Sequence, residues 1–191
     1  MTGFPIFSIG VWNAWIPMLV FFVMTMAPFL LDALRVTSGL TQKMGDSLSG
    51  KAERTRSMFA TCLLFVLYLY SIFLPLELAT AWFYFGLSIW LLGIAFYLSA
   101  LNTAAVTPVG RPFISGAYRF SRHPLYLSMG AVLLAVGIAS ASWLFMIISL
   151  LYLVLVFSFA ASEERDCVET FGAEYLEYMK RTPRWIGWPK A

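Results

Sequence analysis

The stretch SRHPLY, residues 121–126, contains the only histidine of the chain. Pro124 suits the first position of a helix, because its missing N–H would be unbonded there and its φ is already helical. His123 is therefore the predicted N-cap. A helix start presents free N–H groups and a partial positive charge, and so it can bind a carboxylate or phosphate. Arg119 and Arg122 strengthen this preference. An equally open alternative is that these residues only bind lipid phosphates.

Tyr118 and Tyr126 lie on either side of this histidine. An aromatic face can stabilise a cationic centre of a ligand, although tyrosines near a membrane surface usually act as anchors.

A second polar set, Glu163 and Glu164, directly follows the apolar run 143–162. Carboxylates at the end of a helix would oppose its dipole. We favour a helix that continues to Thr170 with both acids on a solvated face. The alternative is that at least one acid binds a cationic or hydroxylated partner. An anion-binding helix start, tyrosines and carboxylates at one membrane depth would suit a zwitterion with a further cationic centre, such as S-adenosylmethionine.

Long apolar segments must position these residues. The chain is 60% hydrophobic and 12% charged with a mean hydropathy of +0.78, whereas soluble domains carry about a quarter charged residues. A membrane helix needs roughly 20 apolar residues. The sequence predicts an all-α integral membrane protein with five transmembrane helices, the fourth of them short. We expect the first to remain in the mature protein, because no basic segment precedes it. The expected spans are Val11–Leu31, Ser57–Leu76, Leu78–Leu101, Leu125–Ala139 and Trp143–Ser162. Because none of these runs alternates apolar and polar residues, a β-barrel is not indicated.

The thirteen basic residues all fall within residues 32–56, 102–123 and 163–191. The positive-inside rule makes these regions cytoplasmic and the N-terminus external. The net charge of +3 then reflects membrane topology, and no nucleic-acid partner is expected.

Cys62 and Cys167 have no Cys or His at ligand spacing, so no metal is expected. Residues 32–56 are interpreted as a connector that could cover the site.

In the C-terminal tail, residues 163–191, the sequence predicts a short helix over Glu174–Arg181, in which Glu177 and Arg181 have the i,i+4 spacing of a stabilising ion pair. Trp185, Ile186 and Trp188 suit the membrane interface. Pro17 and Pro28 should kink the first span or end it early.

Two quoted stretches carry a specific resemblance: SGAYRFSRHPLYLS at residues 115–128 and EERDCVETFGAEYLEYMKRTPRW at residues 163–185. They resemble the isoprenylcysteine carboxyl methyltransferase family and the related membrane phospholipid methyltransferases. The match covers residues 102–185. It implies an S-adenosylmethionine-dependent methyltransferase whose cofactor lies among the cytoplasmic ends of the last two spans and the tail. The cofactor-contacting residues implied are Arg111, Pro112, Phe113, Ile114, Tyr118, His123, Pro124, Leu125, Tyr126 and Glu163.

We assign His123 and the helix start to the cofactor's carboxylate, and Glu163 to its ammonium or ribose hydroxyls. No catalytic residue is assigned. Glu164 and Arg122 are candidates, Glu164 as the base that a primary-amine acceptor would need. Phe159 stands where prenylcysteine methyltransferases have an arginine, which argues against a prenylcysteine substrate.

The predicted function is therefore methyl transfer to a lipophilic or small acceptor at the cytoplasmic face, with membrane lipids as further partners. Alternatives are a phospholipid or amine N-methyltransferase and a non-catalytic adaptor. A small transporter is disfavoured, because no charged residue lies between the ends of the spans. We expect an N-terminal three-helix region (residues 1–101), a catalytic region (residues 102–191) and location in a prokaryotic cytoplasmic membrane.

Overall fold

The computed structural model describes residues 10–34 and 51–189, which form helices without strands. Most of the connector at residues 32–56 lies outside the described residues. The helices are α1 (Trp15–Ala33), α3 (Lys51–Phe73), α4 (Ala81–Val106), η1 (Gly116–Arg119), α5 (Pro124–Ala139), α6 (Trp143–Phe157), α7 (Ala160–Phe171) and α8 (Ala173–Arg181).

Four helical segments are long and apolar enough to cross a membrane: Trp15–Ala33, Glu53–Phe73, Ala81–Val106 and Trp143–Phe171. The chain is therefore a multi-pass membrane protein. The predicted fourth span corresponds to α5, which is apolar but has only 16 residues. At 1.5 Å per residue it extends about 24 Å, less than the roughly 30 Å hydrocarbon core. Five crossings therefore stay a prediction.

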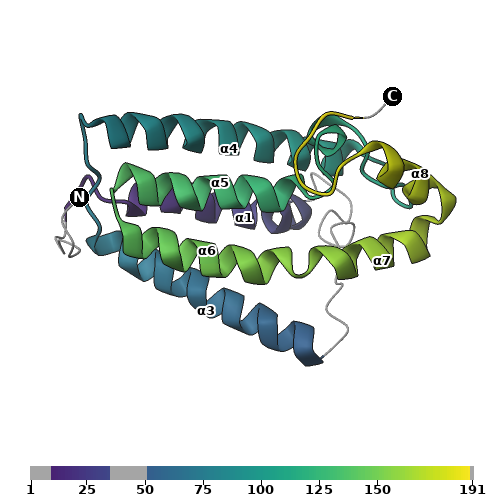
Figure 1. Cartoon of the computed structure of the whole chain (residues 1–191), viewed down its shortest axis with the longest axis horizontal. Helices are drawn as coiled ribbons and strands as arrows, with labels where there is room; N and C mark the ends of the chain where they lie inside the picture. The colour runs from purple at the N-terminus through teal and green to yellow at the C-terminus, as the bar shows by residue number, and fades with distance from the viewer. Residues whose placement is uncertain (1–9, 35–50, 190–191) are drawn as a thin grey trace.

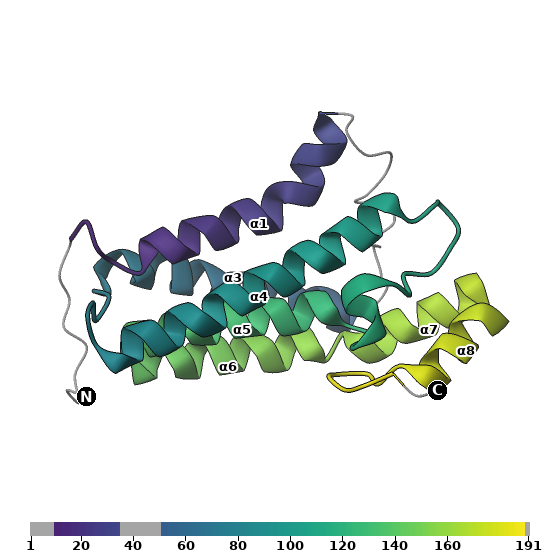
Figure 2. The same ribbon diagram turned by 90° about the horizontal axis from the view of Figure 1, so that it is seen from above.

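The bundle is arranged around α5. Figure 1 shows α5 lying between α4 and α6, with α3 alongside α6 and α1 behind α5. Figure 2, seen from above, places α7, α8 and the loop between α4 and α5 together at one end. The opposite end holds the α5–α6 turn and the α3–α4 connection, where the Glu77 N–H donates to the Ala139 carbonyl at 3.0 Å. The segments with the candidate site residues thus share one end of the bundle.

The predicted span Trp143–Ser162 lies within the apolar helical segment Trp143–Phe171, which has one short interruption. The α-helix stops at Phe157 and restarts at Ala160. At the break, the Ser158 hydroxyl donates to the Leu155 carbonyl at 2.6 Å, and Arg56 of α3 donates to that hydroxyl at 3.1 Å. Such local side-chain bonds compete with helical ones. The break makes the following residues the first turn of a new helix.

Pro17 and Pro28 are predicted to kink the first span, which is α1, or to end it early, and the early end is not observed. The helix includes Pro17 in its first turn and continues past Pro28 to Ala33.

Close packing of α4 on α5 depends on small residues. A Cβ added at Gly86 would lie 2.7 Å from the Ala135 carbonyl oxygen and from the Ala139 amide nitrogen. Small residues let helix backbones approach closely inside a membrane. Gly86 therefore sets the distance between α4, which leads into the site loop, and α5, which begins at the site.

We predict that Gly86→Val destabilises the protein, because its side chain would overlap the α5 backbone. Overpacking costs about 1 to 3 kcal/mol, which is roughly 2 to 4 °C of melting temperature per kcal/mol for a chain of this size. Thermal unfolding in detergent measures the change. Ala95→Val is the matched control, because Ala95 is exposed on the same helix. Equal melting temperatures for the two variants would contradict this packing.

Candidate functional site

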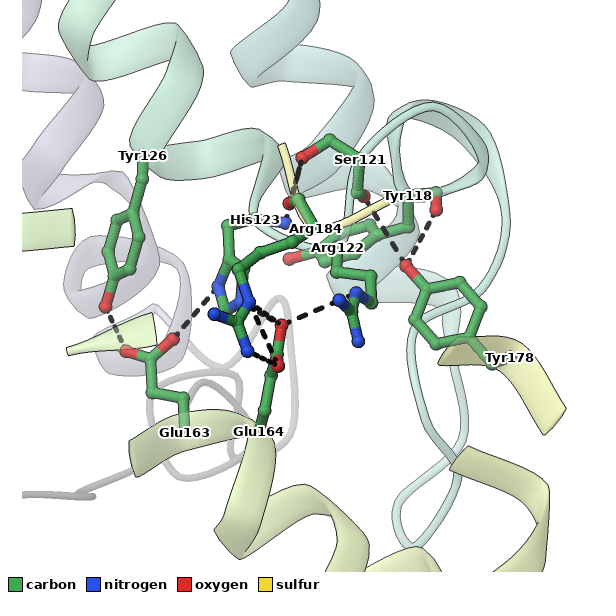
Figure 3. Close-up of polar contacts among 9 residues, drawn as sticks. All are labelled: Tyr118, Ser121, Arg122, His123, Tyr126, Glu163, Glu164, Tyr178 and Arg184. Atoms are coloured by element: carbon green, nitrogen blue, oxygen red, sulfur yellow. Dashed lines mark hydrogen bonds and ion pairs between the residues drawn. The ribbon is translucent and has the colours of Figure 1, made fainter. Parts of the chain in front are cut away.

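His123 is the N-cap of α5 and Pro124 its first residue, as predicted. The His123 side chain makes no capping bond. Its backbone N–H instead donates to the Ser121 hydroxyl at 3.0 Å. The imidazole is only 6% exposed and points away from the start of α5, toward α7 (Figure 3).

Glu164 is a buried carboxylate with three basic neighbours. Arg184 donates from Nε to both carboxylate oxygens, at 3.0 and 3.2 Å, and from Nη2 at 2.6 Å. His123 Nε2 lies 3.1 Å from Oε1, and Arg122 Nε lies 3.4 Å from the same oxygen. The Glu164 side chain is 4% exposed. The favoured solvated face is therefore wrong for Glu164: the helix does continue to Phe171, but this acid has protein partners.

Glu163 lies on the other side of the imidazole. Its Oε2 is 3.4 Å from His123 Nδ1, and the Tyr126 hydroxyl donates to its Oε1. The two ring nitrogens of His123 thus face one carboxylate each, as Figure 3 shows. Glu163 also falls in the first turn of α7, where the helix dipole favours negative charge. Because the helical segment continues to Phe171, the unfavourable dipole interaction of a helix ending before Glu163 does not arise.

Arg122 has hydrogen-bonding capacity left over. Its side chain is 11% exposed. Among the described residues, none accepts a hydrogen bond from its buried Nε, because the Glu164 contact lacks hydrogen-bond geometry. Unpaired buried donors are costly. Arg122 is therefore the cation best able to take an additional anionic partner.

The charges of the cluster balance without any ligand. Two guanidinium groups, Arg122 and Arg184, offset the carboxylates of Glu163 and Glu164 when the imidazole is neutral. The Glu164 carboxylate raises the pKa of Arg184 through their hydrogen bonds. Within this balanced set, the Arg122 Nε has no hydrogen-bond acceptor among the described residues and the Glu163 side chain is 32% exposed, so one cation and one carboxylate have capacity left for a ligand that carries both charges.

The C-terminal segment closes the site by pairing with the loop before α5. The Arg122 N–H donates to the Pro183 carbonyl at 3.1 Å, and the Gly187 N–H donates to Phe120 at 3.0 Å. The Tyr178 hydroxyl donates to the Tyr118 carbonyl at 2.7 Å. Burial raises the pKa of the Tyr178 hydroxyl, so this hydroxyl stays protonated and keeps its donor role at neutral pH.

The remaining predicted residues lie at the edge of this cluster. Arg111 is 64% exposed and pairs with Glu174 of α8 at 2.8 Å. The Phe113 ring packs on the ring of Tyr118, with centroids 5.4 Å apart. Pro112 and Pro124 are buried, Leu125 is half-buried and Ile114 is exposed. The structure thus brings His123, Tyr126 and Glu163 into one contact network, whereas Arg111 contacts α8 instead.

The helix predicted over Glu174–Arg181 is confirmed as α8, and Arg181 pairs with Glu177 at 2.9 Å. Arg184 and Trp185 are site residues that sequence reasoning missed. The Trp185 ring centroid lies 5.7 Å from that of His123 and 4.5 Å from that of Phe157. The second quoted stretch ends with this arginine and tryptophan, so the sequence did mark them. The spacing does not show that this C-terminal segment pairs with the loop before α5.

Within residues 10–34 and 51–189, no group of three His, Cys, Asp or Glu side chains could hold a metal ion. Cys62 is exposed and Cys167 half-buried, and both are free thiols.

Comparison with known proteins gives a family match and a partial match to a curated protein. Residues 42–182 match the family described as "Protein of unknown function (DUF1295)". Methanethiol S-methyltransferase 1 of Bradyrhizobium diazoefficiens is 35% identical over 75 residues, which are 39% of this chain. The match spans only a quarter of the relative's length. The family match and the methyltransferase name agree with the resemblance seen in the sequence.

We predict that Arg184→Ala destabilises the protein, because Glu164 loses three hydrogen-bond contacts while it stays buried. Leaving a buried acceptor unsatisfied costs about 1 to 3 kcal/mol. We expect the loss of unfolding free energy to be smaller than for a buried ion pair that is broken completely, since Arg122 and His123 still contact Glu164. Unfolding in detergent measures this free energy. Arg181→Ala is the control, because it removes an exposed pair worth about 0.5 kcal/mol. An effect no larger than the control's would show that the pair does not hold the C-terminal segment.

Proposed function

This chain belongs to the DUF1295 family, and we propose from this premise that it is an S-adenosylmethionine-dependent membrane methyltransferase acting on a lipophilic or small acceptor. The observation that carries the proposal is the net-neutral cluster of His123, Glu163, Glu164, Arg122 and Arg184 at one end of the bundle. The methyltransferase name of the relative supports the reaction type. The proposed catalytic region is residues 102–191.

The donor set fits this cofactor. The buried Arg122 Nε, which has no hydrogen-bond acceptor among the described residues, would hold the α-carboxylate together with the start of α5. Glu163, 32% exposed, would take the ammonium or the ribose hydroxyls. The rings of Tyr118 and Tyr126 would lie by the sulfonium or the adenine. Arg111, Pro112, Phe113 and Ile114, with Pro124 and Leu125, complete the proposed cofactor-binding set.

We revise the proposed role of His123 on the basis of its contacts. Its ring nitrogens face Glu163 and Glu164 rather than the start of α5. We therefore place the cofactor's carboxylate on Arg122, and we give His123 the role of spacing the two carboxylates while its ring lines the site.

When bound, S-adenosylmethionine supplies an electrophilic methyl group. An acceptor's lone pair would take this methyl group, and the electron pair of the broken carbon–sulfur bond would remain on sulfur. The chain's own residues align the reactants and exclude water, which can supply most of the catalysis in such a displacement. No general base is required for a thiolate or carboxylate acceptor.

Glu164 is poorly suited to act as a base. Its carboxylate accepts hydrogen bonds from Arg184 and faces Arg122 and His123, so its lone pairs are already occupied. We assign it the positioning of these cationic groups. This favours a thiol or lipid-like acceptor over a primary amine. A thiol acceptor is also the one that the relative's name states.

We also propose that the site faces the cytoplasm of a prokaryote. All thirteen basic residues belong to the regions assigned to that side, where positive charge accumulates. The Arg119 and Glu77 side chains are both exposed, and Glu77 lies in the connection assigned to the outer side.

In a Cys62→Ser, Cys167→Ser background, we expect Glu77→Cys to react with a membrane-impermeant maleimide in intact cells. Arg119→Cys should react only after the membrane is permeabilised, because it lies at the opposite end of the bundle. Gel-shift of the labelled protein measures the reaction. The reverse pattern would overturn the proposed topology.

Calorimetry with S-adenosylmethionine and its demethylated product tests the cofactor. We expect the wild type to bind both. Arg122→Ala and Glu163→Ala should each weaken binding at least tenfold, since a hydrogen bond to a charged group is worth about 1.5 to 3 kcal/mol. His123→Ala should weaken binding less, because His123 acts by spacing the two carboxylates.

Arg119→Ala is the matched control, because Arg119 is exposed three residues before Arg122, and it should bind as the wild type does. Absence of binding to the wild type would reject the proposed enzyme. Unchanged binding in all three variants would reject this site.

A further inference from the structure

We propose that Trp185 is a specificity-determining residue that, with Phe157, forms the apolar wall against which an alkyl chain of the methyl acceptor lies. The inference rests on the proposed function and deepens it, because it assigns the acceptor side of the same site. It also gives Trp185 a role other than the membrane-interface anchor expected from the sequence.

The first observation is the packing of the indole ring. It stacks on Phe157 with a 4.5 Å centroid distance and a 30° interplanar angle. On another side it meets the His123 ring at 5.7 Å and 45°. His123 in turn stacks on Tyr126 at 5.6 Å and 5°. A continuous series of four rings therefore connects the polar cluster with α6.

The second observation is where this series leads. Phe157 is the last residue of α6, whose fifteen residues contain no charged side chain. At the other end of the series, the Tyr126 hydroxyl contacts Glu163. An apolar molecule arriving along α6 would thus meet aromatic surface up to the charged groups, where the proposed cofactor is held.

The third observation is that the chain holds Trp185 in place on both sides, whereas the apolar residues that follow it in the sequence are exposed. The preceding residue, Arg184, binds Glu164 through its side chain and accepts a hydrogen bond at its carbonyl from Ser121 at 3.2 Å. Gly187, two residues later, is bonded to Phe120. Trp185 itself is half-buried, whereas Trp188 is 84% exposed. The segment thus directs one of its two tryptophans into the site.

This arrangement selects for acceptors that combine a soft nucleophile with an alkyl group. Sulfur makes favourable contacts at the edges of aromatic rings, and each methylene removed from water favours binding by about fourfold. With an alkanethiol, the thiolate lone pair forms the bond to the methyl carbon, and the bond to the sulfonium breaks. A thioether and the neutral demethylated cofactor result, and the thiol proton goes to solvent.

The test is methyl transfer by the purified full-length protein from S-adenosylmethionine to methane-, ethane-, propane- and butanethiol. For the wild type, kcat/KM should rise about two- to fourfold per added methylene, carried mainly by a falling KM. Trp185→Ala should flatten this dependence to less than 1.5-fold per methylene, and Trp185→Phe should restore most of it. Trp188→Ala, the matched control in the same segment, should behave as the wild type. The Kd of the cofactor by calorimetry should change less than threefold in each variant.

The outcomes separate the two proposals. A wild type that does not bind the cofactor would overturn the proposed function and this inference with it. Cofactor binding with an unchanged chain-length dependence in Trp185→Ala would overturn the inference alone, as would cofactor binding without methylation of any thiol. A loss of cofactor affinity in Trp185→Ala would place the indole on the cofactor side and also overturn it. If Trp185→Ala does not fold, Phe157→Ala replaces it, because Phe157 forms the other half of the wall. A flattened chain-length dependence in this variant supports the wall, and the wild-type dependence overturns it.

Discussion

The buried carboxylate of Glu164 holds this end of the molecule together. It lies on α7, and it is contacted by Arg122 and His123 before α5 and by Arg184 of the C-terminal segment. Three segments far apart in the sequence therefore converge on one charge. A buried charge is tolerated only when it is paired and hydrogen-bonded, so folding must bring all three segments together.

A two-residue interruption separates α6 from α7, and a turn at Gly172 follows α7. Because a new helix begins at Ala160, Glu163 falls in a first turn, where the dipole favours its charge. The following turn at Gly172, with a φ of +55° that a glycine adopts readily, sends α8 back toward the bundle. Tyr178 then reaches the Tyr118 carbonyl, and the segment with Arg184 and Trp185 lies against the loop before α5.

The apolar bundle provides the rigid part of the site. Phe21, Leu67, Val132, Leu133 and Phe145 are fully buried in its main core. Gly86 brings α4 against α5 at backbone contact distance. The site thus lies where a closely packed apolar bundle meets the charged end of the molecule. The aromatic series from Tyr126 to Phe157 crosses that boundary, which is consistent with a charged cofactor on one side and an apolar acceptor on the other.

The sequence by itself determined the features that depend on local chemistry. Apolar runs predicted the membrane helices, Pro124 predicted the start of α5 with His123 as its cap, and the i,i+4 pair predicted α8. The quoted stretches indicated the methyltransferase-like family. These properties follow from hydropathy, backbone geometry and residues close in sequence.

Only the tertiary structure decided the partners of the charged groups. The sequence favoured a solvated Glu164, because nothing local shows that Arg184, twenty residues later, returns to it after two helices and a turn. The same return places Trp185 beside Phe157 rather than simply at the membrane surface. Such contacts depend on the directions of all the helices between the two partners. A change at one helix break or at one positive-φ turn therefore alters every contact that follows it.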